Sequence, residues 1–227
     1  MASADGRRPV ETILTDVGGV VLLPDPAFWA RLREELRPGA DVDPEVVFYG
    51  PDGPWSACRT GEIDYVGYMR AVAARLGVDA GRLEALRSAF EATVNPAMVE
   101  FLTGARAMGL RIVAVSNADT MLERRLYARG LWPLFDAVVN SARVGAAKPD
   151  PRIYQTALKA AGSDAASCLL IDDKERNLPE AASMGIQVAL YTTDDVFSKR
   201  LPASVARLYR APAPAAAAGW AFDKTGA

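Results

Sequence analysis

Asp16 is the first residue of this chain whose surroundings point to chemistry. It ends the short apolar run TILTD and is followed, after one valine, by Gly18 and Gly19. Short apolar runs that stop at glycine are typical of buried strands, and open α/β sheets bind ligands at the carboxyl ends of their strands. Glycine permits a tight turn and a close approach of a ligand. Asp16 is therefore a candidate reactive carboxylate; the alternative is a solvated aspartate at the end of a buried strand.

The same pattern recurs at two later points. Ser116 and Asn117 end the run LRIVAVSN, Asp172 and Asp173 end CLLIDD, and Lys148 stands in a loop before a helix. If the strand ends converge, a carboxylate, a hydroxyl, a lysine and an acid pair could perform phosphoryl transfer assisted by Mg²⁺. Each has a structural alternative: Ser116 and Asn117 as helix caps, Lys148 as a solvated lysine, and the acid pair as charges favoured at a helix start.

Composition narrows the chemistry. The 227 residues include no histidine and only two cysteines, Cys58 and Cys168, so Ser–His and Cys–His nucleophile pairs and histidine-bound zinc are excluded. Cys168, within SCLLIDD, is expected to be a small buried apolar residue. The net charge of -2 is unlike that of nucleic-acid-binding proteins, and no stretch reaches the length of a membrane span. We therefore expect no nucleic-acid partner, no membrane association and a cytoplasmic location.

The second half of the chain alternates between helical and strand patterns. Such alternation predicts a mostly parallel sheet with helices on both faces, an α/β fold. Asp150 is expected to cap a helix whose first residue is Pro151. The predicted strands after residues 13–14 are 110–117, 135–141, 168–173 and 186–193, and the predicted helices are 96–109, 119–130, 150–162 and 178–185.

Residues 25–95 form a different kind of segment. No stretch there has a convincing strand pattern, and residues 26–36, 62–77 and 81–94 carry helical apolar spacing. The segment is therefore predicted to be an all-helical insertion, with the core formed by residues 10–24 and 96–205. The rest of the chain, 206–227, is rich in alanine and proline and is expected to be mobile or lightly docked.

Four stretches, in order, resemble the motifs of the haloacid dehalogenase-like (HAD) hydrolase superfamily. They are ILTDVGGVV, IVAVSN, VGAAKPDPRIY, and LLIDDKERN followed by AASMG. The resemblance covers nearly all of residues 11–192, and the helical insertion lies where that family inserts its type-1 cap. It implies a Rossmann-like α/β core with an inserted α-helical cap domain.

The resemblance also implies roles for single residues. Asp16 matches the nucleophile that becomes an aspartyl-phosphate and is also a metal ligand. Ser116 matches the hydroxyl that holds a phosphate oxygen, with Asn117 beside it as a substrate contact. Lys148 matches the lysine that neutralises charge around the phosphoryl group.

The remaining matches concern the metal and the turn. Asp173 matches the principal acidic Mg²⁺ ligand, and Asn177 matches the polar residue four positions on. Asp172 would either support the metal ligands from behind or act as an alternate ligand. Gly18 would offer its backbone carbonyl to the metal, and Gly18 and Gly19 would contact substrate. The implied cofactor is Mg²⁺, and the implied partner is a small phosphorylated metabolite bound by a monomer or a homodimer.

One position departs from the family pattern. Many HAD phosphatases carry a second aspartate two residues after the nucleophile, as acid and base, and here that residue is Gly18. We favour a phosphatase that has a good leaving group or uses another acid, such as Asp25 or a cap residue. A metal-independent 2-haloacid dehalogenase and a non-catalytic binding protein of this fold are the alternatives. The Asp172–Asp173 pair argues against the dehalogenase.

The helical cap is expected to close over the crevice and set substrate choice. Its aromatic side chains should form mostly the cap's own core, with one or two between Trp55 and Tyr65 facing substrate. Arg59 is either a solvated surface arginine or a second contact for an anionic group. The aromatic residues concerned are Phe28, Trp29, Phe48, Tyr49, Trp55, Tyr65, Tyr68 and Phe90.

Overall fold

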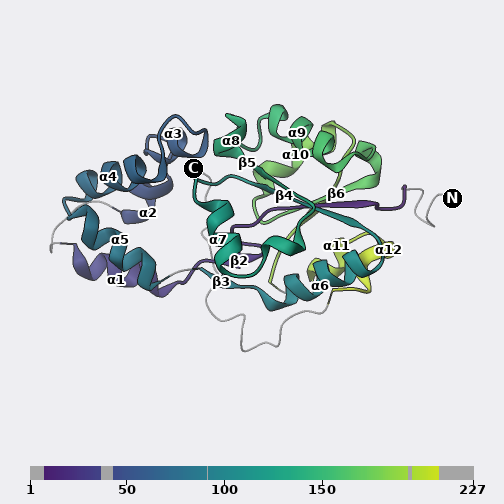
Figure 1. Cartoon of the computed structure of the whole chain (residues 1–227), viewed down its shortest axis with the longest axis horizontal. Coiled ribbons are helices and arrows are strands. Elements are labelled where there is room, and N and C mark those ends of the chain that lie inside the picture. Colours follow the sequence, from purple (N-terminus) through teal and green to yellow (C-terminus); the bar gives the residue numbers. More distant parts are fainter. Residues whose placement is uncertain (1–7, 37–42, 91, 194–195, 210–227) are drawn as a thin grey trace.

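The chain forms a parallel sheet covered by helices, with a separate group of helices to one side (Figure 1). The computed structural model describes residues 8–36, 43–90, 92–193 and 196–209. The sheet is five-stranded and every pair of neighbouring strands is parallel, which confirms the predicted α/β class. Its strands, in spatial order, are β5 (Ala137–Asn140), β4 (Arg111–Ser116), β1 (Thr12–Thr15), β6 (Cys168–Asp172) and β7 (Gln187–Leu190).

β1 lies at the centre of the sheet. Ile13 pairs with Ile112 of β4 on one side and with Leu169 of β6 on the other. After β1 the chain builds the sheet outward through β4 and β5, then returns to add β6 and β7 on the opposite side. Such a reversal leaves a crevice at the carboxyl ends of the strands. The strand order therefore brings the ends of β1, β4 and β6 together at one edge.

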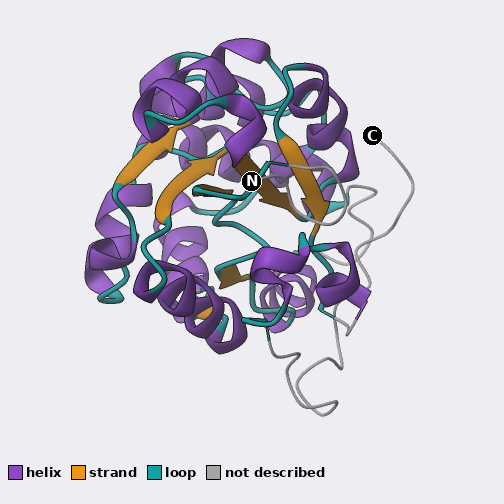
Figure 2. Ribbon diagram, turned by 90° about the vertical axis from the view of Figure 1, so that its right-hand side faces the viewer, coloured by secondary structure: helices purple, strands orange, loops and turns teal. Residues whose placement is uncertain are grey.

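Side chains of each strand alternate between the two faces of the sheet, and helices cover both faces (Figures 1 and 2). Ile13 joins the core on the side of α6, α11 and α12, while Leu14 joins the core on the side of α9 and α10. Burial on both faces explains why these strands read as continuous apolar runs. Cys168 is fully buried, as predicted. The core helices are α6 (Pro96–Ala107), α7 (Leu122–Ala128), α8 (Ser141–Val144), α9 (Pro151–Ala161), α10 (Leu178–Ser183), α11 (Val196–Arg200) and α12 (Ala203–Ala206).

Three short 3₁₀ turns complete the core: η1 (Trp132–Leu134), η2 (Ala165–Ser167) and η3 (Glu175–Asn177).

The start of α9 shows how local sequence sets an element boundary. The Asp150 side chain accepts a hydrogen bond from the Arg152 backbone N–H, and Pro151 is the first helical residue. The predicted cap of this helix is confirmed, since proline lacks the N–H that this position leaves unpaired.

The helices between the two parts of the core pack around their own apolar cluster. Phe48 and Tyr68 are fully buried in it, and Phe48 makes edge-on contacts with Phe28 and Trp29 at centroid distances of 5.7 and 5.3 Å. These aromatic residues form the core of this unit, which we call the cap. Its helices are α1 (Ala27–Glu35), α2 (Pro44–Tyr49), α3 (Trp55–Arg59), α4 (Tyr65–Leu76) and α5 (Ala80–Ala89).

The predicted helix at 81–94 is wrong at its end. α5 stops at Ala89, and β3 (Thr93–Val94) is extended and pairs antiparallel with β2 (Leu22–Leu23). The two connections between cap and core therefore run side by side. Threonine and valine favour extended backbone because their branched β-carbons restrict the side chain in a helix. Their partner strand lies far away in sequence, so local apolar spacing could not predict the pairing.

Part of the predicted tail is described. Residues 206–209 continue from α12, and the Tyr209 ring lies 4.7 Å from that of Phe197 and 6.1 Å from that of Phe101, centroid to centroid. The expectation for residues 210–227 lies outside the described residues. In the part of the chain that the structure describes, no helix combines the length and the apolar character that crossing a bilayer requires.

Asn95 joins the cap connections to the core, and its removal should destabilise the protein. Its buried side-chain amide donates to the Val20 carbonyl and to the Tyr191 hydroxyl, both at 2.7 Å. Asn95→Ala removes the amide that donates to both of these oxygens, so the free energy of unfolding, measured with urea, should fall by about 1–3 kcal/mol. Thr93→Ala is the control, because that exposed hydroxyl makes only a 3.5 Å bond. Equal losses in the two variants would contradict this role.

Candidate active site

Asp16 is buried where three strands end. Its Oδ1 accepts hydrogen bonds from the Val17 backbone N–H at 2.6 Å and from the Ser116 hydroxyl at 2.9 Å. Its own backbone N–H donates to the Ile171 carbonyl of β6 at 2.8 Å. The residue as a whole is 7% exposed. Segments from β1, β4 and β6 therefore fix this candidate nucleophile in one orientation.

Lys148 reaches the same carboxylate from the loop before α9. Its side chain is fully buried, and its Nζ lies 3.1 Å from Asp16 Oδ2 and 2.5 Å from Asp172 Oδ2. A buried ammonium group is tolerated only when acidic groups pair with it. The sequence analysis singled out Asp16, Ser116, Lys148 and Asp172 separately, and the fold brings them into one hydrogen-bonded group.

The Asn117 side chain holds the lysine loop in place. Its amide donates to the Lys148 carbonyl at 2.9 Å, and its side-chain oxygen accepts from the Lys148 backbone N–H at 2.7 Å. With its amide group engaged in this way, Asn117 positions Lys148. Its expected contact with substrate stays a prediction, and it would have to use other atoms or a rearranged side chain.

The two adjacent acids differ in their surroundings. Asp172 is fully buried and accepts hydrogen bonds from Lys148, from the Lys174 backbone N–H at 2.8 Å and from the Asn177 amide at 2.9 and 3.0 Å. Asp173 Oδ2 pairs with Lys174 Nζ at 2.9 Å, whereas the buried Asp173 Oδ1 has no hydrogen-bond partner. Asp172 is thus occupied in positioning Lys148, and Asp173 has a carboxylate oxygen to offer.

Asp16, Asp172 and Asp173 could hold a metal ion together. One carboxylate oxygen from each lies within 4.8 Å of the others. Carboxylate oxygens are the ligands that Mg²⁺ prefers in proteins, and a bound cation would satisfy the unpartnered Asp173 Oδ1. The residues therefore fit the predicted Mg²⁺.

Burial and the neighbouring charges shift the pKa values of Asp16 and Lys148. Burial raises the pKa of Asp16 to about 7; Lys148 opposes the rise, and Asp172 and Asp173 add to it. Burial also works against the charge on Lys148, but Asp16 and Asp172 outweigh it and raise the lysine's pKa above its usual value. Nearby like charges disfavour ionisation, and an added cation reverses that effect. A divalent cation would therefore favour the carboxylate form of Asp16.

The two glycines after Asp16 have different constraints. Gly19 has a φ of +81°, and a β-carbon there would collide with the Asp173 carboxylate. Gly18 is exposed, has no positive φ, and a β-carbon there would meet no atom within 4 Å. Gly19 is needed for the close approach of Asp173, while the space at Gly18 would accept a side chain. The predicted metal and substrate contacts of both glycines rest on their backbone atoms.

A charged contact between cap and core escaped the sequence analysis. Asp119 is buried and binds the Arg125 guanidinium through both oxygens, at 2.9 and 3.0 Å. The Arg125 guanidinium carbon lies 5.2 Å from the centroid of the cap residue Tyr65, whose ring also lies 5.6 Å from that of Arg87. Asp119 lies only three residues after Ser116, but an aspartate in that place is typical of a helix cap. It does accept a hydrogen bond from the Met121 backbone N–H at 2.8 Å.

Asp25, the candidate replacement acid, has a structural task. Its carboxylate accepts a hydrogen bond from the Ala27 backbone N–H at 2.9 Å, at the start of α1. Its use as an acid stays a prediction.

Arg59 lies at the last position of α3, half-buried, rather than on an open surface.

Sequence comparison bears on this geometry. The family model described as haloacid dehalogenase-like hydrolase matches residues 10–185. A relative from Mycobacterium tuberculosis (strain CDC 1551 / Oshkosh), Phosphatase MT3486, is 40% identical over 81 residues, which are 35% of this chain and 36% of that protein. The chain covers 19% to 37% of the length of the first three curated relatives that it matches.

Two solved structures share the fold. A HAD family enzyme from Bacteroides thetaiotaomicron, bt-2542, in complex with magnesium and inorganic phosphate, has a TM-score of 0.67 and 20% identity, covering 81% of this chain and 94% of that one. L-2-haloacid dehalogenase from Xanthobacter autotrophicus, with chloropropionic acid covalently bound, has a TM-score of 0.63 and 18% identity, covering 87% of each. At these identities the likeness shows the fold alone. With a family model that matches residues 10–185 of 227, the chain belongs to the haloacid dehalogenase-like hydrolases.

Proposed function

We propose that this hydrolase is an Mg²⁺-dependent phosphatase that cleaves a small phosphomonoester through an aspartyl-phosphate on Asp16. The observation that carries the proposal is the buried group of Asp16, Lys148, Asp172 and Asp173, in which Asp173 keeps an unpartnered oxygen. A nucleophilic carboxylate, one lysine and a cation-binding set of acids are what phosphoryl transfer from a small ester needs.

In the proposed reaction, the Asp16 carboxylate attacks phosphorus, an oxygen–phosphorus bond forms, and the bond to the leaving alkoxide breaks. The alkoxide takes a proton from solvent or from another acid, because Gly18 has none to give. Water then attacks the aspartyl-phosphate, which releases phosphate and restores the carboxylate. The Ser116 hydroxyl, 2.9 Å from Asp16, is close enough to hold a phosphoryl oxygen, and Lys148 stabilises charge on the transferring group.

Asp16, Asp173 and the Gly18 carbonyl would hold the Mg²⁺, with Asp172 beside them. When bound, the ion supplies charge stabilisation to the phosphoryl oxygens and orients the substrate. Asp173 Oδ1 supports this assignment because a buried carboxylate oxygen without a hydrogen bond is costly unless a cation or water pairs with it.

The dehalogenase remains the second candidate. It is favoured by Gly18, which leaves no acid two residues after the nucleophile. Against it stands the cluster of three carboxylates, which would gather unbalanced negative charge near a carboxylate substrate. The phosphatase makes use of that charge through its metal, and is therefore preferred.

Replacing the nucleophile tests the reaction. Asp16→Asn should abolish phosphate release from aryl, sugar and nucleotide phosphates while circular dichroism stays that of the wild type, since the amide cannot form the acyl phosphate. Wild-type release should require Mg²⁺ and disappear with a chelator. Undiminished turnover in Asp16→Asn would rule out the mechanism. Halide release from a 2-haloacid without metal would identify a dehalogenase instead.

Metal binding can be tested without turnover. Mg²⁺ should raise the thermal midpoint of the wild type, because a ligand at 100 times its Kd stabilises the folded state by about 2.7 kcal/mol. Asp173→Asn should lose this response. Asp164→Asn is the control, because that carboxylate is exposed and pairs with Arg8 at the surface. The assignment fails if Asp173→Asn responds to Mg²⁺ as the wild type does.

Gly18→Asp tests what the missing acid costs. The space at Gly18 accepts a side chain, and general acid–base catalysis is typically worth about 10²–10⁴-fold in rate. The variant should accelerate hydrolysis of alkyl phosphates, whose leaving groups need a proton, much more than that of 4-nitrophenyl phosphate. Gly18→Asn, with the same shape and no acid, should give no gain. Identical rates for the Asp and Asn variants would show that the enzyme obtains its proton elsewhere.

A further inference from the structure

Arg59 is a half-buried cation with which no acidic side chain forms an ion pair among the residues that the structure describes. Its Nε is buried and has no hydrogen-bond partner. Arg87, the other half-buried arginine among the described cap residues, instead lies over the rings of Phe48 and Tyr65 at 5.9 and 5.6 Å. Taking a charged group out of water without a partner is unfavourable. A bound anion could therefore supply the partner that the Arg59 Nε lacks.

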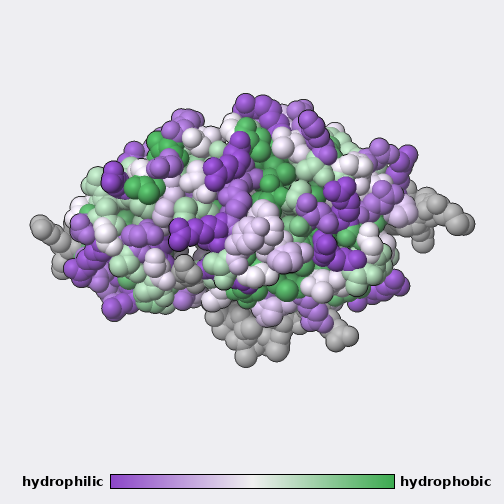
Figure 3. All heavy atoms as spheres, in the orientation of Figure 1, coloured by the Kyte–Doolittle hydropathy of each residue, from purple (hydrophilic) through white to green (hydrophobic). Residues whose placement is uncertain are grey.

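The end of α3 is held against the core. Gly61, two residues after Arg59, has a φ of +77°, and a β-carbon there would collide with the Ala142 carbonyl of α8. α8 begins directly after β5, whose carboxyl end lies at the same edge of the sheet as the active site. Arg59 is thus fixed at the boundary between cap and core. Figure 3 shows one face of the molecule, on which hydrophilic side chains lie between the two parts.

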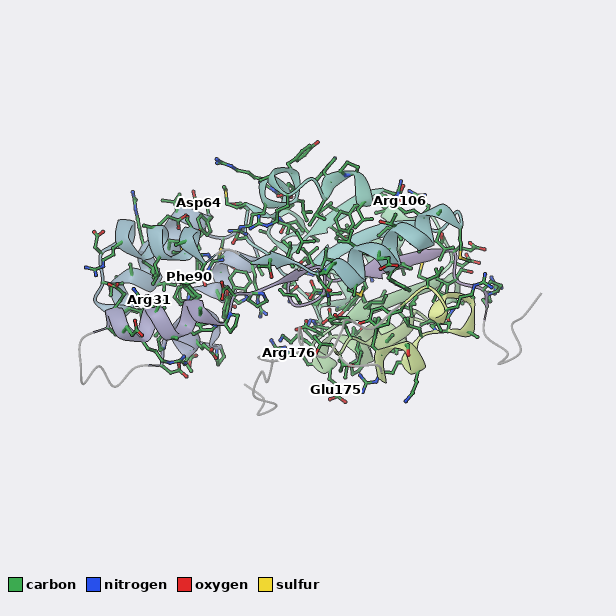
Figure 4. All side chains as sticks on the ribbon, turned by 90° about the horizontal axis from the view of Figure 1, so that it is seen from below. Arg31, Asp64, Phe90, Arg106, Glu175 and Arg176 are labelled. Carbon is green, nitrogen blue, oxygen red and sulfur yellow. The ribbon has the colours of Figure 1, made fainter. Side chains whose placement is uncertain are left out.

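A second arginine approaches from the core. Arg176 belongs to η3, three residues after Asp173, and Figure 4 shows it on the side of the core that faces the cap. Three residues span at most about 11 Å of backbone, so Arg176 stays near the metal-binding acids. Burial lowers the pKa of Arg59, and the positive charge of Arg176 lowers it further. Arg176 therefore adds positive charge on the core side of the boundary.

We infer that Arg59 forms a second anion-binding subsite at the boundary between cap and core, and that the substrate carries a carboxylate or another phosphate in addition to its phosphomonoester. The inference rests on the proposed phosphatase function and narrows it to doubly anionic substrates. An anion at the Arg59 guanidinium group would pair its buried Nε. Arginine suits this task because its planar donors match carboxylate and phosphate oxygens.

A matched series of substrates tests the subsite. Propyl phosphate, 3-phosphooxypropanoate and propane-1,3-diyl bisphosphate share a three-carbon chain and differ only in a neutral, carboxylate or phosphate end. The wild type should prefer the two doubly anionic compounds. Arg59→Met should raise KM for these two by about 10- to 100-fold, the effect of losing a charged hydrogen bond, and leave that for propyl phosphate within about 2-fold. The two anionic arms show which group the subsite takes.

Arg70→Met is the matched control, because Arg70 is an exposed arginine on α4 of the same cap. It should leave all three KM values unchanged. The inference is overturned if Arg59→Met changes the three compounds equally or changes none. Calorimetric binding of the same compounds to Asp16→Asn separates the two proposals. No hydrolysis by the wild type would reject the phosphatase; equal affinity of Asp16→Asn for neutral and anionic compounds would reject the subsite.

Discussion

The buried ammonium group of Lys148 is the interaction on which the active site depends. It has no exposure and lies between Asp16 at the end of β1 and Asp172 at the end of β6. Removing an ion from water costs several kcal/mol, which close acidic partners must offset. Both partners are available only because β6 pairs directly with β1 at the centre of the sheet. The strand order and the charge arrangement therefore stabilise one another.

The same arrangement explains the affinity expected for a cation. Lys148 approaches two of the three clustered carboxylates, and the third, Asp173, keeps a buried oxygen without a partner. Gly19 lets that carboxylate lie against the backbone, where any side chain would collide with it. The site is therefore built with more negative than positive charge close to its centre.

The cap is joined to the core by contacts between distant parts of the sequence. β2 and β3 pair the two connecting segments, and Asn95 fixes them to the core. Tyr65, at the start of α4, lies between Arg125 of the core and Arg87 of the cap. These contacts position the cap at the edge of the sheet that holds the acids.

The sequence by itself determined most of the elements and the polar residues that stand at their ends. Apolar runs, the Asp150–Pro151 helix start and the polar residues at strand ends are local patterns, and local sterics and hydrogen bonding fix them. Only the tertiary structure decided how similar residues differ. Asp172 is bound to Lys148 whereas Asp173 is not, Asn117 holds a lysine loop, residues 93–94 form a strand, and Arg59 is half-buried. Each of these depends on a neighbour that is distant in sequence or on burial created by packing, and no local pattern encodes either.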